Sequence, residues 1–123
     1  MYQLKRVYDF VNDSDQPRFP AVLADRLWPR GIAKVRLEGV LWLKSVTPSD
    51  ELRQWLHQDP LAHYDEFCLR YRHELSAEAV QADLQQLRRL HAQHNRLTLL
   101  TAAKAIEHSH LPVLQAVLQG GLK

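Results

Sequence analysis

The feature that most constrains the fold of this chain is a short apolar run that ends directly in charged residues. The run covers residues 19–24, and Asp25 and Arg26 follow it at once. An apolar run of this length between breaker residues is typical of a buried β-strand, which we expect over 21–26. Ligand sites of open α/β sheets form at the carboxyl ends of their strands. Asp25 and Arg26 are therefore candidate site residues.

Other segments of the chain have strand or loop patterns. Residues 97–101 form a second apolar run and predict the clearest strand, while residues 3–8 alternate in the manner of a half-buried strand. Residues 9–18 carry turn-forming side chains and predict a surface loop. Residues 40–44 fit either a short strand or a single helical turn. Because continuous apolar runs are typical of strands covered on both faces, we expect 21–26 and 97–101 to be adjacent and parallel.

Capping residues mark the expected helix starts, which in chain order are Thr47, Asp59, Ser76 and Ser109. A proline follows each of the first two caps directly, which suits the first helical position. The first of these helices should end near His57 and the third near Asn95. In the second helix, Tyr64, Phe67, Cys68, Tyr71 and Leu75 share one face. The single cysteine, Cys68, is therefore expected to be a largely buried packing residue.

Length and composition limit the possible architectures. A chain of 123 residues, 46% hydrophobic and 24% charged, is typical of one globular domain, 1–123. The order of strands and helices predicts an α/β fold. We expect a small, mostly parallel sheet of about three to four strands, covered by about four to five helices.

The same composition excludes several classes of protein. One cysteine cannot form an intrachain disulfide, and no segment reaches the ~18 apolar residues of a membrane span. The N-terminus lacks the apolar core of a signal peptide. We therefore expect a cytoplasmic protein with no membrane partner. A formal net charge of +2 is too small to indicate a nucleic-acid partner by itself.

Two polar clusters follow the two apolar strands. The first contains Asp25, Arg26, Trp28, Arg30 and Lys34, and the second contains Lys104, Glu107, His108, Ser109 and His110. If the strands are adjacent and parallel, both clusters open at one edge of the sheet. Arginine and lysine bind phosphate or carboxylate groups, and aspartate and histidine can transfer protons.

Structural roles compete with these functional ones. Asp25 also suits an ion pair with Arg26 or Arg30, and Trp28 also suits a core or lid position. His108 and His110 are too close in sequence for the helical metal-binding spacing, and no third ligand is evident, so we expect no metal or other cofactor. The sequence contains no glycine-rich phosphate loop and no nucleophile elbow.

The string Asp-Arg-Leu-Trp-Pro-Arg-Gly at residues 25–31 resembles the domain of unknown function 488 (DUF488) family, in particular its short YeaO-like branch. Segments 5–9, 42–55 and 97–110 also fit, so the resemblance covers nearly the whole chain. It implies a compact cytoplasmic α/β protein and no specific activity. That branch usually has Tyr, Asp and Asn where this chain has Thr101, Ala105 and Ser109, and these differences lie at the expected site.

From these residues we expect a pocket for a phosphorylated or otherwise anionic small molecule, nucleotide-like ligands included. The expected roles are anion binding for Arg26, Arg30 and Lys104, a pocket wall for Trp28, and proton transfer for Asp25 and His108. Two alternatives stay open, a nucleic-acid-associated or regulatory protein and a non-enzymatic protein-interaction module. The sequence does not decide between enzyme and binding protein, and it leaves the oligomeric state open.

Overall fold

The computed structural model describes residues 1–13 and 20–120 and contains a sheet of four parallel strands in these ranges. The strands are β1 (Tyr2–Arg6), β2 (Ala21–Leu23), β3 (Leu41–Trp42) and β4 (Leu97–Thr101). Their order across the sheet is β1-β4-β2-β3, so β2 and β4 are adjacent and parallel as expected. Their carboxyl ends therefore meet at the same edge of the sheet.

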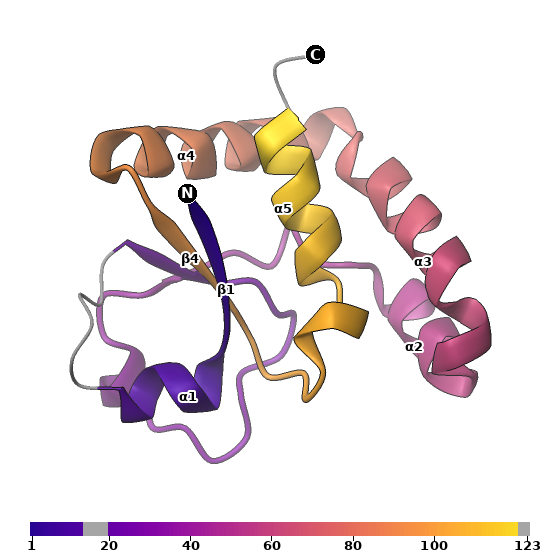
Figure 1. The fold of residues 1–123 in the computed structure, drawn as a ribbon, viewed down its shortest axis with the longest axis horizontal. Helices are drawn as coiled ribbons and strands as arrows, with labels where there is room; N and C mark the ends of the chain where they lie inside the picture. The colour runs from indigo at the N-terminus through magenta and orange to yellow at the C-terminus, as the bar shows by residue number, and fades with distance from the viewer. Residues whose placement is uncertain (14–19, 121–123) are drawn as a thin grey trace.

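Helices pack around this sheet. The described residues form α1 (Val7–Asn12), α2 (Asp50–Gln58), α3 (Pro60–Leu75), α4 (Glu78–His94) and α5 (Leu111–Gly120), with short 3₁₀ helices η1 (Lys34–Leu37) and η2 (Ile106–His108). In Figure 1, α4 runs along the top of the molecule, and α2 and α3 lie to the right of the strands. The predicted α/β class, with a small parallel sheet covered by helices, is confirmed.

Each face of the sheet carries its own hydrophobic core. Successive side chains of a strand point to opposite faces, so Leu99 belongs to one core and Leu100 to the other. The larger core takes side chains from the long helices, such as Phe67, Leu87 and Leu114. The smaller core takes Val7, Phe10, Val11 and Leu37, which come from α1 and η1. The sheet is thus fixed from both sides, and its carboxyl edge is held rigidly.

The expected strand over 3–8 is shorter than predicted, because a helix follows at once. β1 ends at Arg6 and α1 begins at Val7, so residues 9–12 are helical and do not belong to a loop. Val7, Phe10 and Val11 are all buried, and their i, i+3, i+4 spacing is that of a helix with one apolar face. Of the predicted loop 9–18, residues 14–18 lie outside the described residues.

The other two uncertain segments are settled by backbone hydrogen bonds. β2 ends at Leu23, three residues before the predicted end. The Ala24 N–H still donates to the Leu100 carbonyl at 3.0 Å, and Asp25 then starts the loop that leaves the sheet. Within residues 40–44, Leu41 and Trp42 form a short strand beside β2.

Two of the four predicted helix caps are wrong. Ser49 and not Thr47 caps α2, because the Ser49 Oγ accepts a hydrogen bond from the Leu52 N–H at 3.2 Å. The Thr47 hydroxyl instead donates to the Lys44 carbonyl. Ser76 follows the last residue of α3 and donates to the His73 carbonyl, and α4 begins after Ala77 with no side-chain cap.

The remaining helix boundaries agree with the sequence pattern. Asp59 caps α3 by accepting from the Ala62 N–H at 3.4 Å. The Ser109 Oγ accepts a hydrogen bond from the N–H of Leu111, and Leu111 is the first residue of α5. Asn95 ends α4 with a φ of 59°, a left-handed conformation that asparagine tolerates better than most residues.

α3 packs on the core by the predicted face. Phe67, Tyr71 and Leu75 are buried, and Tyr64 and Cys68 are partly buried against the margin of the same core. Cys68 is thus a packing residue as predicted, with part of its surface accessible.

No helix of the described residues has the length and apolar character needed to cross a membrane.

Candidate functional site

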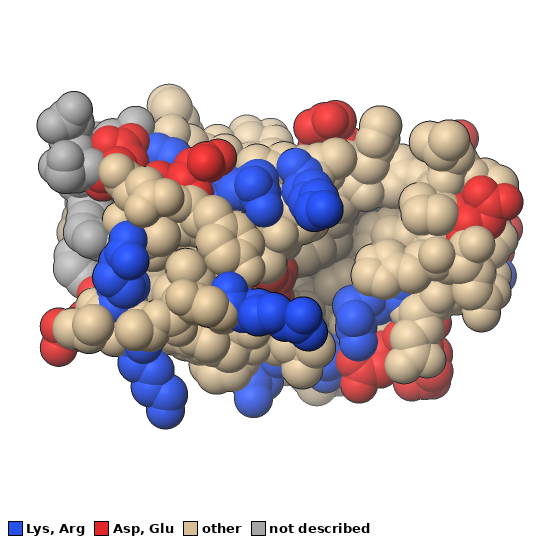
Figure 2. All heavy atoms as spheres, turned by 90° about the horizontal axis from the view of Figure 1, so that it is seen from below, with Lys and Arg blue, Asp and Glu red and all other residues tan. Residues whose placement is uncertain are grey.

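A cavity of about 580 Å³ lies at the carboxyl ends of β2 and β4. Its walls come from the loop 25–30, from residues 101–110 at the end of β4 and beyond it, and from residues 47–48 with α2 and the first half of α3. Tyr8 of α1 completes the lining. Figure 2 shows the hollow from below, with Lys and Arg side chains on both of its sides. The site thus occupies the position that parallel α/β sheets commonly use for ligands.

Five of the six predicted site residues line this cavity, namely Asp25, Arg26, Trp28, Arg30 and His108. Lys104 does not line it and is exposed. Its neighbours Ala103 and Ala105 both line the cavity, so the chain passes along the wall while the Lys104 side chain lies outside. The two polar clusters therefore converge, except that Lys34, Lys104 and Glu107 do not line the cavity.

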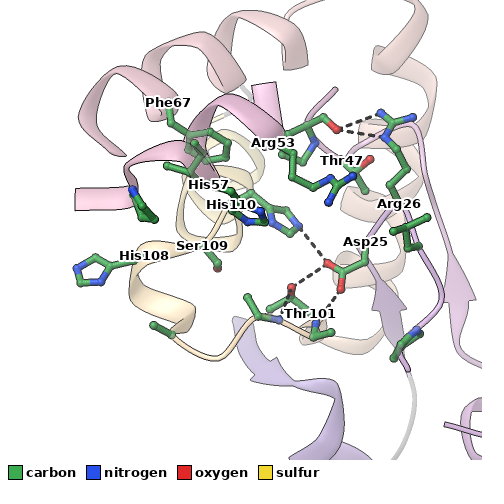
Figure 3. A pocket seen from close by; sticks show the side chains of 18 of the residues that line it. Asp25, Arg26, Thr47, Arg53, His57, Phe67, Thr101, His108, Ser109 and His110 are labelled. Atoms are coloured by element: carbon green, nitrogen blue, oxygen red, sulfur yellow. Dashed lines mark hydrogen bonds and ion pairs between the residues drawn. The ribbon is translucent and has the colours of Figure 1, made fainter. Parts of the chain in front are cut away.

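Asp25 joins the ends of the two central strands. Its Oδ1 accepts a hydrogen bond from the Thr101 hydroxyl at 2.8 Å, and its Oδ2 accepts from the Ala102 N–H at 2.7 Å. The His110 Nε2 lies 3.5 Å from Oδ1. Figure 3 shows this carboxylate at the base of the pocket. Both oxygens of Asp25 are engaged, so this side chain is held in one orientation.

His110 has a defined hydrogen-bonding pattern. Its Nε2 contacts two acceptors, the Ala24 carbonyl and the Asp25 carboxylate, so Nε2 carries a hydrogen. The rings of His110 and Tyr71 pack edge to face, with their centroids 5.8 Å apart. Burial lowers the pKa of His110 below its ordinary value, against the opposing effects of Asp25 and the Ala24 carbonyl. The ring is therefore neutral at pH 7, with an unprotonated Nδ1.

Arg26 connects the loop after β2 to the start of α2. Its Nε and Nη2 donate to the Pro48 carbonyl at 3.2 and 3.1 Å, and its Nε lies 3.6 Å from the Asp50 carboxylate. The Arg26 side chain is 33% exposed. Much of its hydrogen-bonding capacity is thus used to brace the cavity wall.

Arg53 on α2 contains an unsatisfied donor. Its Nη2 lies 3.4 Å from the Asp50 carboxylate, but its Nε is buried and has no hydrogen-bond partner. Within the described residues, no other buried side-chain nitrogen or oxygen lacks a partner. In Figure 3 the Arg53 guanidinium points into the cavity between Arg26 and His110. The Nε is closed to solvent, so the remaining nitrogens of this guanidinium are the ones available to a ligand in the cavity.

The remaining predicted residues line the outer part of the cavity. Arg30 is exposed, and no carboxylate of the described residues pairs with its guanidinium. The Trp28 indole N–H donates to the Ile32 carbonyl at 2.6 Å, and its ring contacts Trp42 edge to face, so Trp28 is a fixed wall. His108 is exposed, and its ring lies against Tyr64 with centroids 5.6 Å apart.

Charge and polarity are divided within the cavity. The lining contains three guanidiniums, those of Arg26, Arg30 and Arg53, and a single carboxylate, that of Asp25. Apolar side chains supply much of the rest, among them Pro48, Leu56, Pro60, Phe67 and Ala102. No group of three His, Cys, Asp or Glu side chains in the described parts of the chain could hold a metal ion. The arrangement suits an anion that also has an apolar part.

Sequence reasoning missed Arg53 as a site residue. The signal was present in the spacing of α2, because Arg53, Leu56 and His57 fall at i, i+3 and i+4 and all three line the cavity. His110 was placed in the second cluster, but its contacts with Ala24 and Asp25 depend on the meeting of distant segments. Only the fold could supply that relationship.

Comparison with known proteins places the chain in a family. The family model described as the inactive DUF488-N3 subclade matches residues 1–123. The uncharacterized protein Rv3073c of Mycobacterium tuberculosis strain H37Rv is 38% identical over 118 residues, which cover 96% of this chain and 93% of that protein. The uncharacterized protein YeaO of Escherichia coli strain K12 is 40% identical over 114 residues, 91% of each chain. No solved structure matches the chain. This chain therefore belongs to the DUF488 family, in the subclade described as inactive.

Proposed function

We propose that the cavity binds an anionic small molecule, a phosphorylated compound in particular, and does not transform it. The observation that carries this proposal is the set of three guanidiniums, those of Arg26, Arg30 and Arg53, that line one cavity with a single carboxylate. The Arg53 side chain is 36% exposed, so its guanidinium is accessible although its Nε is closed to solvent. An oxyanion of the ligand would gain charge-assisted hydrogen bonds from these groups.

The charge balance of the lining supports an anion. Arg30 has no carboxylate partner among the described residues, and Arg26 and Arg53 share the single carboxylate of Asp50. Three guanidiniums in one hollow repel each other unless a negative group lies between them. Planar guanidinium groups match the oxygens of phosphate and carboxylate groups.

The size and the apolar wall support an organic ligand. Small-molecule pockets commonly have volumes of about 300–1,000 Å³, and this cavity has about 580 Å³. Free phosphate would fill only a small part of it. Phe67 and the prolines of the wall give an apolar surface for a ring, so aryl phosphates and nucleotide-like compounds are the class we propose.

Binding without chemistry is favoured by the family and by the position of Asp25. The matching subclade is described as inactive. Both oxygens of Asp25 accept hydrogen bonds from the protein, which leaves this carboxylate poorly placed to take a proton from a ligand. The proton-transfer roles of Asp25 and His108 stay predictions. Chemical conversion of phenyl phosphate or adenosine monophosphate by the protein would support them.

The test is a thermal-shift titration with phenyl phosphate, adenosine monophosphate and inorganic phosphate. A ligand present at about 100 times its dissociation constant should add about 2.7 kcal/mol to the free energy of unfolding. Arg53→Gln and the exposed Arg30→Gln should each lose most of this gain. Arg89→Gln is the matched control, because Arg89 is exposed on α4 and does not line the cavity.

Two results would overturn the proposal. One is the absence of any shift with these anions at millimolar concentration. The other is a shift that Arg53→Gln and Arg30→Gln both retain at the wild-type magnitude, because the anion would then bind elsewhere.

A further inference from the structure

We infer that the site selects an oxyanion that carries a hydrogen, such as a phosphate monoester, over an oxyanion without one, such as a sulfate ester. The inference rests on the proposed function and concerns the acceptor groups of the cavity lining. These belong to His110 and Asp25, which contact each other and both line the cavity.

The hydrogen on His110 is committed to the protein. Its Nε2 faces the Ala24 carbonyl and the Asp25 Oδ1, and both of these atoms are acceptors. The neutral ring therefore presents the lone pair of Nδ1, which accepts hydrogen bonds and cannot donate one. The described residues donate no hydrogen bond to Nδ1, and Figure 3 shows the His110 ring directed into the pocket.

The arginines of the lining have the reverse character. Arg53 and Arg30 both bring guanidiniums to the cavity, and no carboxylate of the described residues pairs with Arg30. A bound oxyanion therefore meets donors as well as an acceptor. Beside the acceptor lies the negative charge of Asp25, which disfavours a second negative charge on the ligand.

This division distinguishes phosphate from sulfate. A phosphate monoester has its second pKa at about 6, so near this pH much of it is a monoanion with one P–O–H group. That hydroxyl can donate to the His110 Nδ1 while the other oxygens accept from Arg53. A sulfate ester is also a monoanion, but it has no hydrogen to donate and would place lone pairs against Nδ1. Leaving that acceptor unpaired should reduce affinity by about tenfold.

The test compares phenyl phosphate with phenyl sulfate by calorimetry at about pH 6.5, where part of the phosphate ester is a monoanion and the lowered pKa of His110 favours its neutral ring. The expected result is that phenyl phosphate binds at least about tenfold more tightly. In His110→Gln, the side-chain amide nitrogen can occupy the place of Nε2 and donate to the Ala24 carbonyl, but nothing replaces Nδ1. This variant should bring the affinity ratio close to one, and the control His94→Gln should leave it unchanged, since His94 does not line the cavity.

A second measurement does not depend on any variant. Nitrogen-15 NMR of the wild-type histidine rings should show Nδ1 of His110 unprotonated in the free protein and hydrogen-bonded after phenyl phosphate is added. A protonated Nδ1 in the free protein would overturn the inference, as would equal affinities for the two esters. Equal affinities that both depend on Arg53 would leave the proposed function standing, whereas no binding of either ester would overturn both.

Discussion

The Asp25 carboxylate accepts a hydrogen bond from the Thr101 hydroxyl at 2.8 Å, although the two residues lie 76 positions apart in the chain. Asp25 follows β2 and Thr101 ends β4, so this contact ties together two strands that are already neighbours in the sheet. The Ala102 N–H donates to the other oxygen of the same carboxylate. Asp25 thus orders the base of the cavity as well as lining it.

Replacing Asp25 should destabilise the fold. In Asp25→Asn, one acceptor oxygen becomes an amide group that faces either the Thr101 hydroxyl or the Ala102 N–H. An unsatisfied donor in this half-buried position should lower the free energy of unfolding by about 1–3 kcal/mol. Urea denaturation measures the change, with Asp65→Asn, an exposed residue of α3, as the control. A loss below about 0.5 kcal/mol would contradict the anchoring role.

The start of α2 offers a second stability test. Ser49 accepts from the Leu52 N–H, and its hydroxyl also lies 2.6 Å from the Glu74 carboxylate on α3. Ser49→Ala removes both contacts and should cost about 0.5–2 kcal/mol in thermal or urea unfolding. Ser76→Ala is the contrast, because the exposed Ser76 hydroxyl bonds only within its own turn. Equal losses in the two variants would count against Ser49 as the functional cap.

The adjacency of β2 and β4 could be predicted from the sequence because it depends on local composition. Residues 97–101 contain three leucines and two threonines with no charged side chain, and all five are buried in an inner strand of the sheet. Such a run is typical of a strand covered on both faces. The cap at Asp59 was predictable for the same reason, since an aspartate followed by a proline acts within four residues.

Other features depended on packing that a local pattern does not contain. Thr47 and Ser49 are both good caps by type, and Glu74 of the distant α3 stabilises Ser49 in that role. Lys104 follows a strand as closely as Arg26 does, yet it lies outside the cavity because the chain turns it toward solvent. Arg53 of α2 lines the same cavity as Arg26 of the loop after β2, a meeting of distant segments that no short window of sequence records.

Acid should destabilise the folded protein through His110. Burial lowers the pKa of His110 below the ordinary value of 6.5, while the facing Asp25 acts in the opposite direction and the Tyr71 ring contacts it from α3. Between the lowered pKa of the folded state and 6.5, the unfolded chain therefore binds more protons than the folded chain. Stability consequently falls as the pH drops through this window, and the contribution of His110 levels off below the folded-state pKa.

Two measurements check the acid sensitivity. NMR titration of the His110 ring should give a midpoint below 6.5. The free energy of unfolding should also fall more for the wild type than for His110→Gln when the pH is lowered from about 7.5 to about 5.5. Protonation of other groups, including His91 with its similarly lowered pKa, is common to both proteins and cancels in the difference. A His110 midpoint above 6.5 would reverse the sign and contradict the prediction.

Lys104 and Arg53 should differ in their effect on anion binding, although each contributes one positive charge. Lys104 is exposed and lies outside the cavity lining, whereas Arg53 lines the cavity with a buried and unpaired Nε. At about 0.15 M salt the screening length is about 8 Å, so an exposed charge outside the pocket contributes little to a bound anion. Phenyl phosphate titrations at this salt concentration should therefore give nearly wild-type affinity for Lys104→Gln and at least about a tenfold loss for Arg53→Gln.

Repeating both titrations at low salt separates the two kinds of effect, because only the contribution of Lys104 should grow as screening weakens. A loss in Lys104→Gln as large as that in Arg53→Gln, at the higher salt, would mean that this segment closes over the ligand and brings the lysine into the site.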